Sequence, residues 1–145
     1  IRYRKLCKSK KIGFFVSNDV NLMTYLKADG LYVSAYNKSH KIAFLKKSKY
    51  KIIGSAHNLK EFNIKKKQGC DFVFLSRLFK TNYKNKDDFL GIIKFNLFSK
   101  LIREKLVPLG GINTIKLNSI QNDNCEAIAL SSQIKLNNYI NKKFY

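Results

Sequence analysis

The chain has 145 residues, of which 45% are hydrophobic and 13% aromatic, and its formal net charge is +20. This length fits a single domain over residues 1–145 with a packed core, and the composition excludes a disordered chain. No apolar run approaches the roughly 20 residues of a membrane-spanning helix, so we expect no membrane partner. The basic start, IRYRKLCKSK, lacks the apolar segment of a secretory signal.

The strong positive charge has two interpretations. Clustered Lys and Arg neutralise phosphates, which would favour a basic nucleic-acid-binding module. The basic residues are mostly Lys, however, and they are spread along a chain that is also rich in Asn, Ile, Phe and Tyr, a bias typical of an AT-rich genome. A basic surface also concentrates small phosphorylated anions. We therefore expect a small phosphorylated ligand, and nucleic acid as the alternative partner.

The three cysteines, Cys7, Cys70 and Cys125, are far apart and form no CxxC pair. This pattern disfavours a disulfide framework or a zinc site and fits a reducing compartment. We expect a cytoplasmic protein in which Cys70 and Cys125 are structural thiols.

Apolar runs alternate with helical patterns along the chain. The sequence predicts strands over 12–17, 30–34, 51–55, 71–76, 106–111 and 126–132. It predicts helices over 19–27, 39–47, 58–69, 89–105, 113–121 and 133–144, and a long polar loop over 77–91. Ser39 and Asn58 stand where N-caps are expected, and Glu61 has the capping-box spacing from Asn58.

The predicted strands are nearly continuous apolar runs, as in parallel sheets that are covered on both faces. Six strand–helix units therefore indicate an α/β domain. Most of the strands end in small polar residues, and ligands bind at the carboxyl ends of parallel strands. Gly110-Gly111 and Ser131-Ser132 end two successive strands, each just before a helix. Such a place suits a phosphate, although a tight turn with a serine cap explains it as well.

Five segments in this order, FFVSND, ADGLYV, KIIGSAHNLKE, VPLGGI and AIALSSQI, resemble the thiamine phosphate synthase and thiazole tautomerase superfamily. The family patterns are Asn-Asp, Ala-Asp-Gly-(Ile/Val)-His, Ser-x-His, Pro-Thr-x-Thr-Lys, Gly-Gly-(Ile/Met) and a phosphate-binding pair. The resemblance implies thiamine biosynthesis and a TIM (β/α)8-barrel fold. About six of its βα units match this chain, and we expect the first two strands to be missing from it.

The resemblance also implies a binding site for a thiazole phosphate or thiamine phosphate. Gly110, Gly111, Ser131 and Ser132 would hold the phosphate. Thr81 and Lys84 match the first Thr and the Lys of the loop on the thiazole side.

Two further positions match the part of the family site where the reaction takes place. Ser55 corresponds to the Ser of Ser-x-His, near the reacting pyrimidine and pyrophosphate. His57 is the matching His, which transfers protons in the tautomerase branch; a helix cap or a packing role is the alternative.

The family's Mg²⁺ ligands are two Asp residues, and here these positions are Asn18 and Asn37. Neutral amides are poor substitutes for carboxylates at this hard cation, so Mg²⁺ binding is in doubt. Asp19 is adjacent to Asn18 and would serve only after a shift of one residue.

These features favour a thiamine phosphate synthase-like transferase, weak or inactive in its metal and pyrophosphate site. It would couple a hydroxymethylpyrimidine pyrophosphate to a thiazole phosphate and release pyrophosphate. A thiazole tautomerase-like proton shuttle through His57 and a non-catalytic phosphate binder stay open as alternatives. An incomplete barrel also leaves sheet edges that a homodimer would cover.

Overall fold

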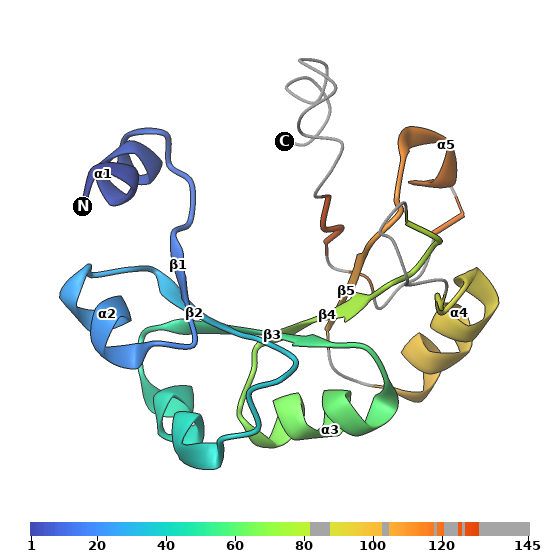
Figure 1. Cartoon of the computed structure of the whole chain (residues 1–145), viewed down its shortest axis with the longest axis horizontal. Coiled ribbons are helices and arrows are strands. Elements are labelled where there is room, and N and C mark those ends of the chain that lie inside the picture. Colours follow the sequence, from blue (N-terminus) through green and yellow to red (C-terminus); the bar gives the residue numbers. More distant parts are fainter. Residues whose placement is uncertain (82–87, 103–104, 118, 121–124, 126, 131–145) are drawn as a thin grey trace. The chain divides into compact units, whose positions relative to one another are not determined.

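The computed structural model describes residues 1–81, 88–102, 105–117, 119–120, 125 and 127–130. Its five strands are hydrogen-bonded neighbours in chain order, β1-β2-β3-β4-β5 (Figure 1). The chain divides into two compact units, Ile1–Phe74 and Leu75–Tyr145, and β4 (Phe72–Ser76) crosses from the first to the second.

The first unit alternates short strands with helices. Its elements are α1 (Arg2–Ser9), β1 (Phe15–Ser17), α2 (Val20–Tyr25), β2 (Gly30–Val33), η1 (His40–Lys47), β3 (Lys51–Ala56) and α3 (Leu59–Lys67). The predicted strands of this part are confirmed, and β2 pairs in parallel with β1 and β3. The helix expected over 39–47 is a 3-10 helix, and Ser39 Oγ caps it by accepting a hydrogen bond from Lys41 N.

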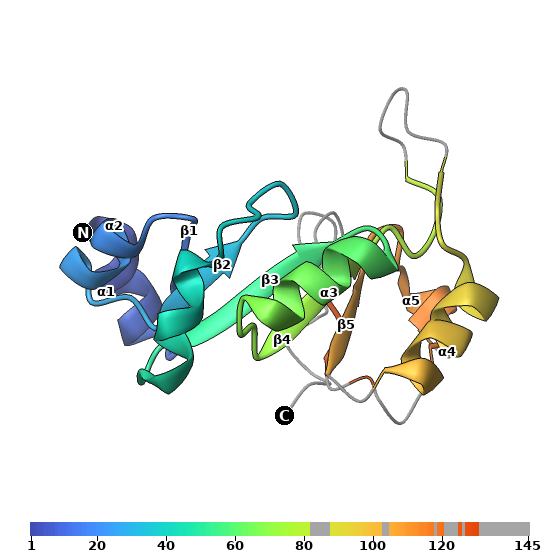
Figure 2. The same ribbon diagram turned by 90° about the horizontal axis from the view of Figure 1, so that it is seen from below.

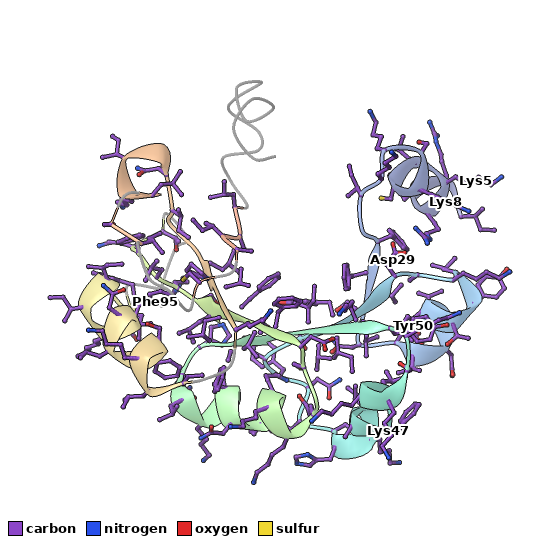
Figure 3. The ribbon with its side chains drawn as sticks, turned by 180° about the vertical axis from the view of Figure 1, so that it is seen from behind. Lys5, Lys8, Asp29, Lys47, Tyr50 and Phe95 are labelled. Carbon is purple, nitrogen blue, oxygen red and sulfur yellow. The ribbon has the colours of Figure 1, made fainter. Side chains whose placement is uncertain are left out.

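An aspartate just before the strand fixes the start of β2 and of β4 in the same way. The Asp29 N–H donates to Phe14 O, and the Asp29 carboxylate accepts from Phe14 N. The Asp71 N–H donates to Ile52 O, and its carboxylate accepts from Ile52 N. Arg4 of α1 also forms a bidentate pair with Asp29, which lies near the start of β2 (Figure 3).

Apolar side chains from strands and helices form one core cluster in the first unit. Met23 of α2, Leu31 of β2 and Ile52 of β3 are fully or almost fully buried in it. Helix α3 runs along the sheet beside β3, and it buries Phe62 (Figure 2). Strands β1, β2 and β3 pair in parallel, so their carboxyl ends lie at the same edge of the sheet.

The second unit contains α4 (Ile92–Leu101), β5 (Leu106–Leu109) and α5 (Thr114–Leu117). Within the strand expected over 126–132, Ala129 forms an isolated parallel bridge with Leu109, and Cys125 just before it forms one with Leu106. Residues 126 and 131–132 of this prediction lie outside the described residues. The helix expected over 133–144 lies outside the described residues. The α/β class with parallel strands is thus confirmed, whereas the incomplete TIM (β/α)8 barrel of about six βα units stays a prediction.

In the described part of the chain, no helix is both long enough and apolar enough to cross a lipid bilayer.

Candidate functional site

The carboxyl ends of β1 and β2 bring Asn18 and Asn37 together. Asn18 follows the last residue of β1 and has φ 57°, a left-handed conformation that asparagine tolerates better than most residues. Asn37 closes a turn after β2, in which its N–H donates to Ser34 O over 3.1 Å. Residues that are 19 positions apart in sequence therefore become direct neighbours.

Hydrogen bonds already occupy both amide oxygens of this pair. Asn18 Oδ1 accepts from Asn37 Nδ2 (3.1 Å) and from Ser34 N (3.0 Å). Asn18 Nδ2 lies within donating distance of Ser34 Oγ (3.1 Å), and Asn37 Oδ1 accepts from Ser39 N (2.9 Å). The arrangement is a neutral, self-satisfied amide pair.

This donor set does not fit a resident Mg²⁺, which prefers charged oxygen ligands. The nearest carboxylate in sequence is Asp19, and Asp19 Oδ1 accepts from Leu22 N (2.9 Å) as the N-cap of α2. Among the described residues, no group of three or more His, Cys, Asp and Glu side chains could hold a metal ion.

Ser55 and His57 lie two positions apart at the carboxyl end of β3. Ser55 is buried, whereas the His57 side chain is 47% exposed. Glu61 of α3 accepts from both the main-chain N–H of His57 (2.8 Å) and its ring Nδ1 (2.9 Å). This contact leaves Nε2 as the ring nitrogen that does not face Glu61.

Glu61 is held in its charged form by His57. Burial raises the pKa of the Glu61 carboxyl, but the hydrogen bonds from His57 and the nearby charges of His57 and Lys65 outweigh burial and lower it. Asn58 Oδ1 caps α3 by accepting from Glu61 N (2.9 Å). In an ordinary capping box the Glu61 carboxylate would accept a hydrogen bond from the main-chain N–H of Asn58. Here it accepts from the main-chain N–H of His57, one residue earlier.

Two buried polar residues, Lys65 of α3 and its C-cap residue Gln68, were not predicted as part of the site. Both are 0% exposed. Lys65 Nζ donates to Ser34 O (2.7 Å), Asn37 O (2.6 Å) and Gln68 Oε1 (2.9 Å). Burial lowers the pKa of the Lys65 ammonium, and the nearby Cys70 and Glu61 oppose this shift. The sequence signal was weak, because Lys65 stands within a run of three lysines.

In the second unit, the glycine pair lies against the segment that follows β4. Gly110 and Gly111 have φ values of 99° and 66°. Leu78 N donates to Leu109 O and Phe79 N to Gly110 O, each over 3.0 Å. A Cβ on Gly111 would lie 2.7 Å from Lys80 O. The adjacent glycines are therefore explained by a close approach of the chain itself.

Thr81 ends this segment with a buried side-chain hydroxyl. Its Oγ1 is out of contact with solvent, and among the described residues it finds no hydrogen-bond partner. A buried hydroxyl in this state is uncommon and is a reason to look for a ligand. Lys84, Ser131 and Ser132, the other members of the expected phosphate side, lie outside the described residues.

The chain is similar to known proteins over most of its length. Residues 1–134 match the family model described as thiamine monophosphate synthase. Over 133 residues the chain is 30% identical to a thiamine-phosphate synthase of Prochlorococcus marinus subsp. pastoris, covering 91% of this chain and 38% of that protein. Over 147 residues it is 31% identical to thiamine-phosphate synthase 1 of Streptococcus pneumoniae strain R6, covering 98% of this chain and 69% of that protein.

A solved structure has the same fold. The thiamine phosphate pyrophosphorylase from Pyrococcus furiosus superposes with a TM-score of 0.70 at 21% identity, covering 88% of this chain and 61% of that one. The chain thus spans 38% of the length of the first Prochlorococcus relative and about two thirds of the streptococcal one.

Proposed function

Because the chain belongs to the thiamine monophosphate synthase family, we propose that it acts in thiamine biosynthesis as a thiamine-phosphate synthase. In the proposed reaction, the ring nitrogen of a thiazole phosphate attacks the methylene carbon of hydroxymethylpyrimidine pyrophosphate. A carbon–nitrogen bond forms, the carbon–oxygen bond breaks, and pyrophosphate leaves with the electron pair. The observation that carries the proposal is the family match over residues 1–134.

We assign the pyrimidine side to the first unit. Ser55 and His57 stand at the end of β3, at the sheet edge where parallel α/β folds bind ligands. The Glu61 carboxylate orients the His57 ring, so His57 can present Nε2 to a substrate as a hydrogen-bond or proton-transfer group. Asn18 and Asn37 would supply amide hydrogen bonds beside them.

We assign the thiazole phosphate side to the second unit. Thr81 Oγ1 is a buried hydroxyl without a hydrogen-bond partner among the described residues, as expected of a group that a substrate completes. Gly110 and Gly111, with Ser131, Ser132 and Lys84, stay predicted phosphate ligands. The two glycines can contribute main-chain groups only, because glycine has no side chain, and the main chain of residues 79–80 lies against Gly111.

Magnesium has no clear protein ligand in this proposal. The Asn18–Asn37 pair and the capping role of Asp19 argue against a resident ion in the first unit. The departing pyrophosphate therefore requires cationic help from elsewhere on the protein or from an ion that arrives with the substrate. The tautomerase-like, non-catalytic and nucleic-acid-binding alternatives gain no support from the comparisons.

The proposal includes two further expectations, one about cellular location and one about assembly. The described cysteines are free thiols, which fits the predicted cytoplasmic location. A homodimer is the predicted assembly, and sedimentation velocity over a range of concentrations would test it.

The direct test is an assay of the 145-residue chain with both substrates, in the presence and absence of Mg²⁺. Formation of thiamine phosphate with release of one pyrophosphate per turnover would support the proposal. Calorimetric titration with thiazole phosphate and with inorganic phosphate at equal salt would accompany it. No product, together with thiazole phosphate binding no tighter than that of inorganic phosphate, would overturn the proposal.

A further inference from the structure

We propose that Lys65 positions the turn from Ser34 to Asn37 and, through that turn, the Asn18–Asn37 amide pair. Its role in substrate binding rests on the proposed synthase function, whereas its role in ordering the turn does not. Lys65 lies on α3, well away in sequence from the residues that it would position.

The hydrogen bonds form a closed ring. Lys65 Nζ donates to the carbonyl oxygens of Ser34 and Asn37, which are the first and last residues of the turn. Asn37 Nδ2 then reaches Asn18 Oδ1, and the same oxygen accepts from Ser34 N. The path from the ammonium through both turn residues to Asn18 is therefore continuous.

Gln68 supports the ammonium from the next turn of the helix. Its Oε1 accepts the third Lys65 proton, so all three donors of the ammonium are satisfied. Its Nε2 donates to Asn37 O (3.0 Å) and to Ser39 O (2.9 Å). Together the two side chains hold four hydrogen bonds to main-chain oxygens of residues 34–39.

The sheet also makes room for the lysine. A Cβ on Gly54 of β3 would lie 3.0 Å from Lys65 Cδ and 3.1 Å from Cγ. Glycine at this position therefore lets the aliphatic stem pass beside the strand to reach the turn. A buried ammonium is expensive to desolvate, and an apolar side chain of similar volume is often at least as stabilising. Positioning explains the lysine better than stability does.

The test replaces Lys65 by Met, with Lys67→Met as the matched control on the exposed side of the same helix. The turn carbonyls keep one donor each in Lys65→Met, since Ser34 O still accepts from Asn37 N and Asn37 O from Gln68 Nε2. Hydrogen exchange of the Ser34 N–H, which donates to Asn18 Oδ1, is compared with that of the buried core residue Leu31.

We expect Lys65→Met to accelerate Ser34 exchange about tenfold relative to Leu31, and Lys67→Met to leave this ratio unchanged. Equal acceleration at both amides, or none at Ser34, would overturn the proposal, since a merely structural lysine would affect the whole unit. Gln68→Met is the second variant; it keeps the ammonium and should accelerate Ser34 exchange in the same direction, and unchanged exchange would count against the ring.

Calorimetric titration with hydroxymethylpyrimidine pyrophosphate separates this inference from the proposed function. Weaker binding by Lys65→Met, with unchanged binding by Lys67→Met, supports positioning for substrate. Equal binding by wild type and Lys65→Met despite a loosened turn overturns that role. A selectively loosened turn in a protein whose wild type does not bind the substrate upholds the positioning of the turn and counts against the synthase function.

Discussion

Asn37 donates a hydrogen bond from Nδ2 to Asn18 Oδ1 over 3.1 Å, so two amides meet at the positions where the resemblance predicts the family's two carboxylates. Two ionised carboxylates at this separation would repel each other unless a cation lay between them. The amide pair satisfies itself without an ion. This relationship makes the metal requirement of the protein testable by substitution.

The double variant Asn18→Asp/Asn37→Asp should gain a cation site. In the absence of Mg²⁺, we expect it to lose about 1–3 kcal/mol of unfolding free energy at neutral pH, because like charges replace a hydrogen bond. Added Mg²⁺ should recover this loss, since an ion that binds only the folded state stabilises it. Urea unfolding with and without Mg²⁺ measures both effects.

Asn58→Asp is the control for the added charge, because an aspartate caps α3 as well as the asparagine does. Its stability should not respond to Mg²⁺. A double variant whose unfolding is equally indifferent to Mg²⁺ would show that this strand edge cannot hold the ion.

Gly111→Ala should be more destabilising than a glycine substitution that meets only conformational strain. Gly91 has φ 76° and nothing within 4 Å of an added Cβ, so Gly91→Ala should cost about 1–3 kcal/mol from strain alone. At Gly111 the added carbon also meets Lys80 O at 2.7 Å. We expect an additional loss of at least about 1 kcal/mol from this clash.

Thermal or denaturant unfolding of the two glycine variants measures this difference. Equal losses would mean that residues 79–80 move aside without cost. The comparison also bears on ligand binding, because weakened phosphate binding by a Gly111 variant follows from a displaced segment as readily as from a blocked phosphate site.

Thr81→Val should separate stability from ligand binding. Valine removes a buried hydroxyl that has no partner among the described residues, so we expect the unfolding free energy to stay the same or rise by up to about 1 kcal/mol. If the hydroxyl contacts the substrate, thiazole phosphate should bind about tenfold more weakly. Calorimetry measures the affinity and urea unfolding the stability.

Thr24→Val is the matched control, because Thr24 is an exposed residue of α2 whose hydroxyl donates to Val20 O. It should not change thiazole phosphate binding. Thr81→Val binding as tightly as wild type would remove Thr81 from the ligand site, and a large loss of stability would show that the hydroxyl has a structural partner.

Cys70 should react slowly and should stabilise the fold in a pH-dependent way. Burial raises the pKa of its thiol to about 11, and the Lys65 ammonium only partly opposes this. Near pH 8 its thiolate population should therefore be about a hundredfold below that of a thiol with a pKa of 9.0, and iodoacetamide should label it correspondingly slowly. Mass spectrometry measures the labelling rate of Cys70, and the labelling rate of a small free thiol in the same buffer serves as the reference.

The sign of the pH effect follows from the raised pKa of Cys70. The unfolded chain loses this proton first, so the stabilisation is complete below pH 9.0 and disappears as pH rises through about 11. The difference in unfolding free energy between wild type and Cys70→Ala should shrink by up to about 3 kcal/mol over this interval. A difference that is constant from pH 8 to 11 would contradict the burial of the thiol.

The sequence predicted the strands well because each is a short apolar run followed by a turn residue, a local signal. It also placed the N-caps at Ser39 and Asn58. The helix predicted over 39–47 is present as η1, which has 3-10 geometry and buries Ile42 and Leu45, and the sequence pattern did not specify that geometry.

The candidate site was less predictable, because its contacts depend on tertiary structure. Asn18 and Asn37 were identified from their positions, but their mutual hydrogen bond is visible only once β1 and β2 are in register. Lys65 stands in a run of three lysines, and nothing in the sequence marks one of them as buried. Only the packing of α3 on β3 shows that it points inward past Gly54. The glycine pair was noted as a place of close approach, but the partner it admits is the chain at residues 79–80.

Asp29 and Asp71 align neighbouring strands at their amino ends, away from the candidate site at the carboxyl ends. Parallel strands have no tight hairpin to set their alignment, and a slip of one residue would turn every side chain to the opposite face. Each aspartate holds the beginning of its strand against the neighbouring one through two hydrogen bonds. Alignment is thereby set at the amino ends, so residues at the carboxyl ends, such as Asn18 and Asn37, can change without disturbing how the strands match.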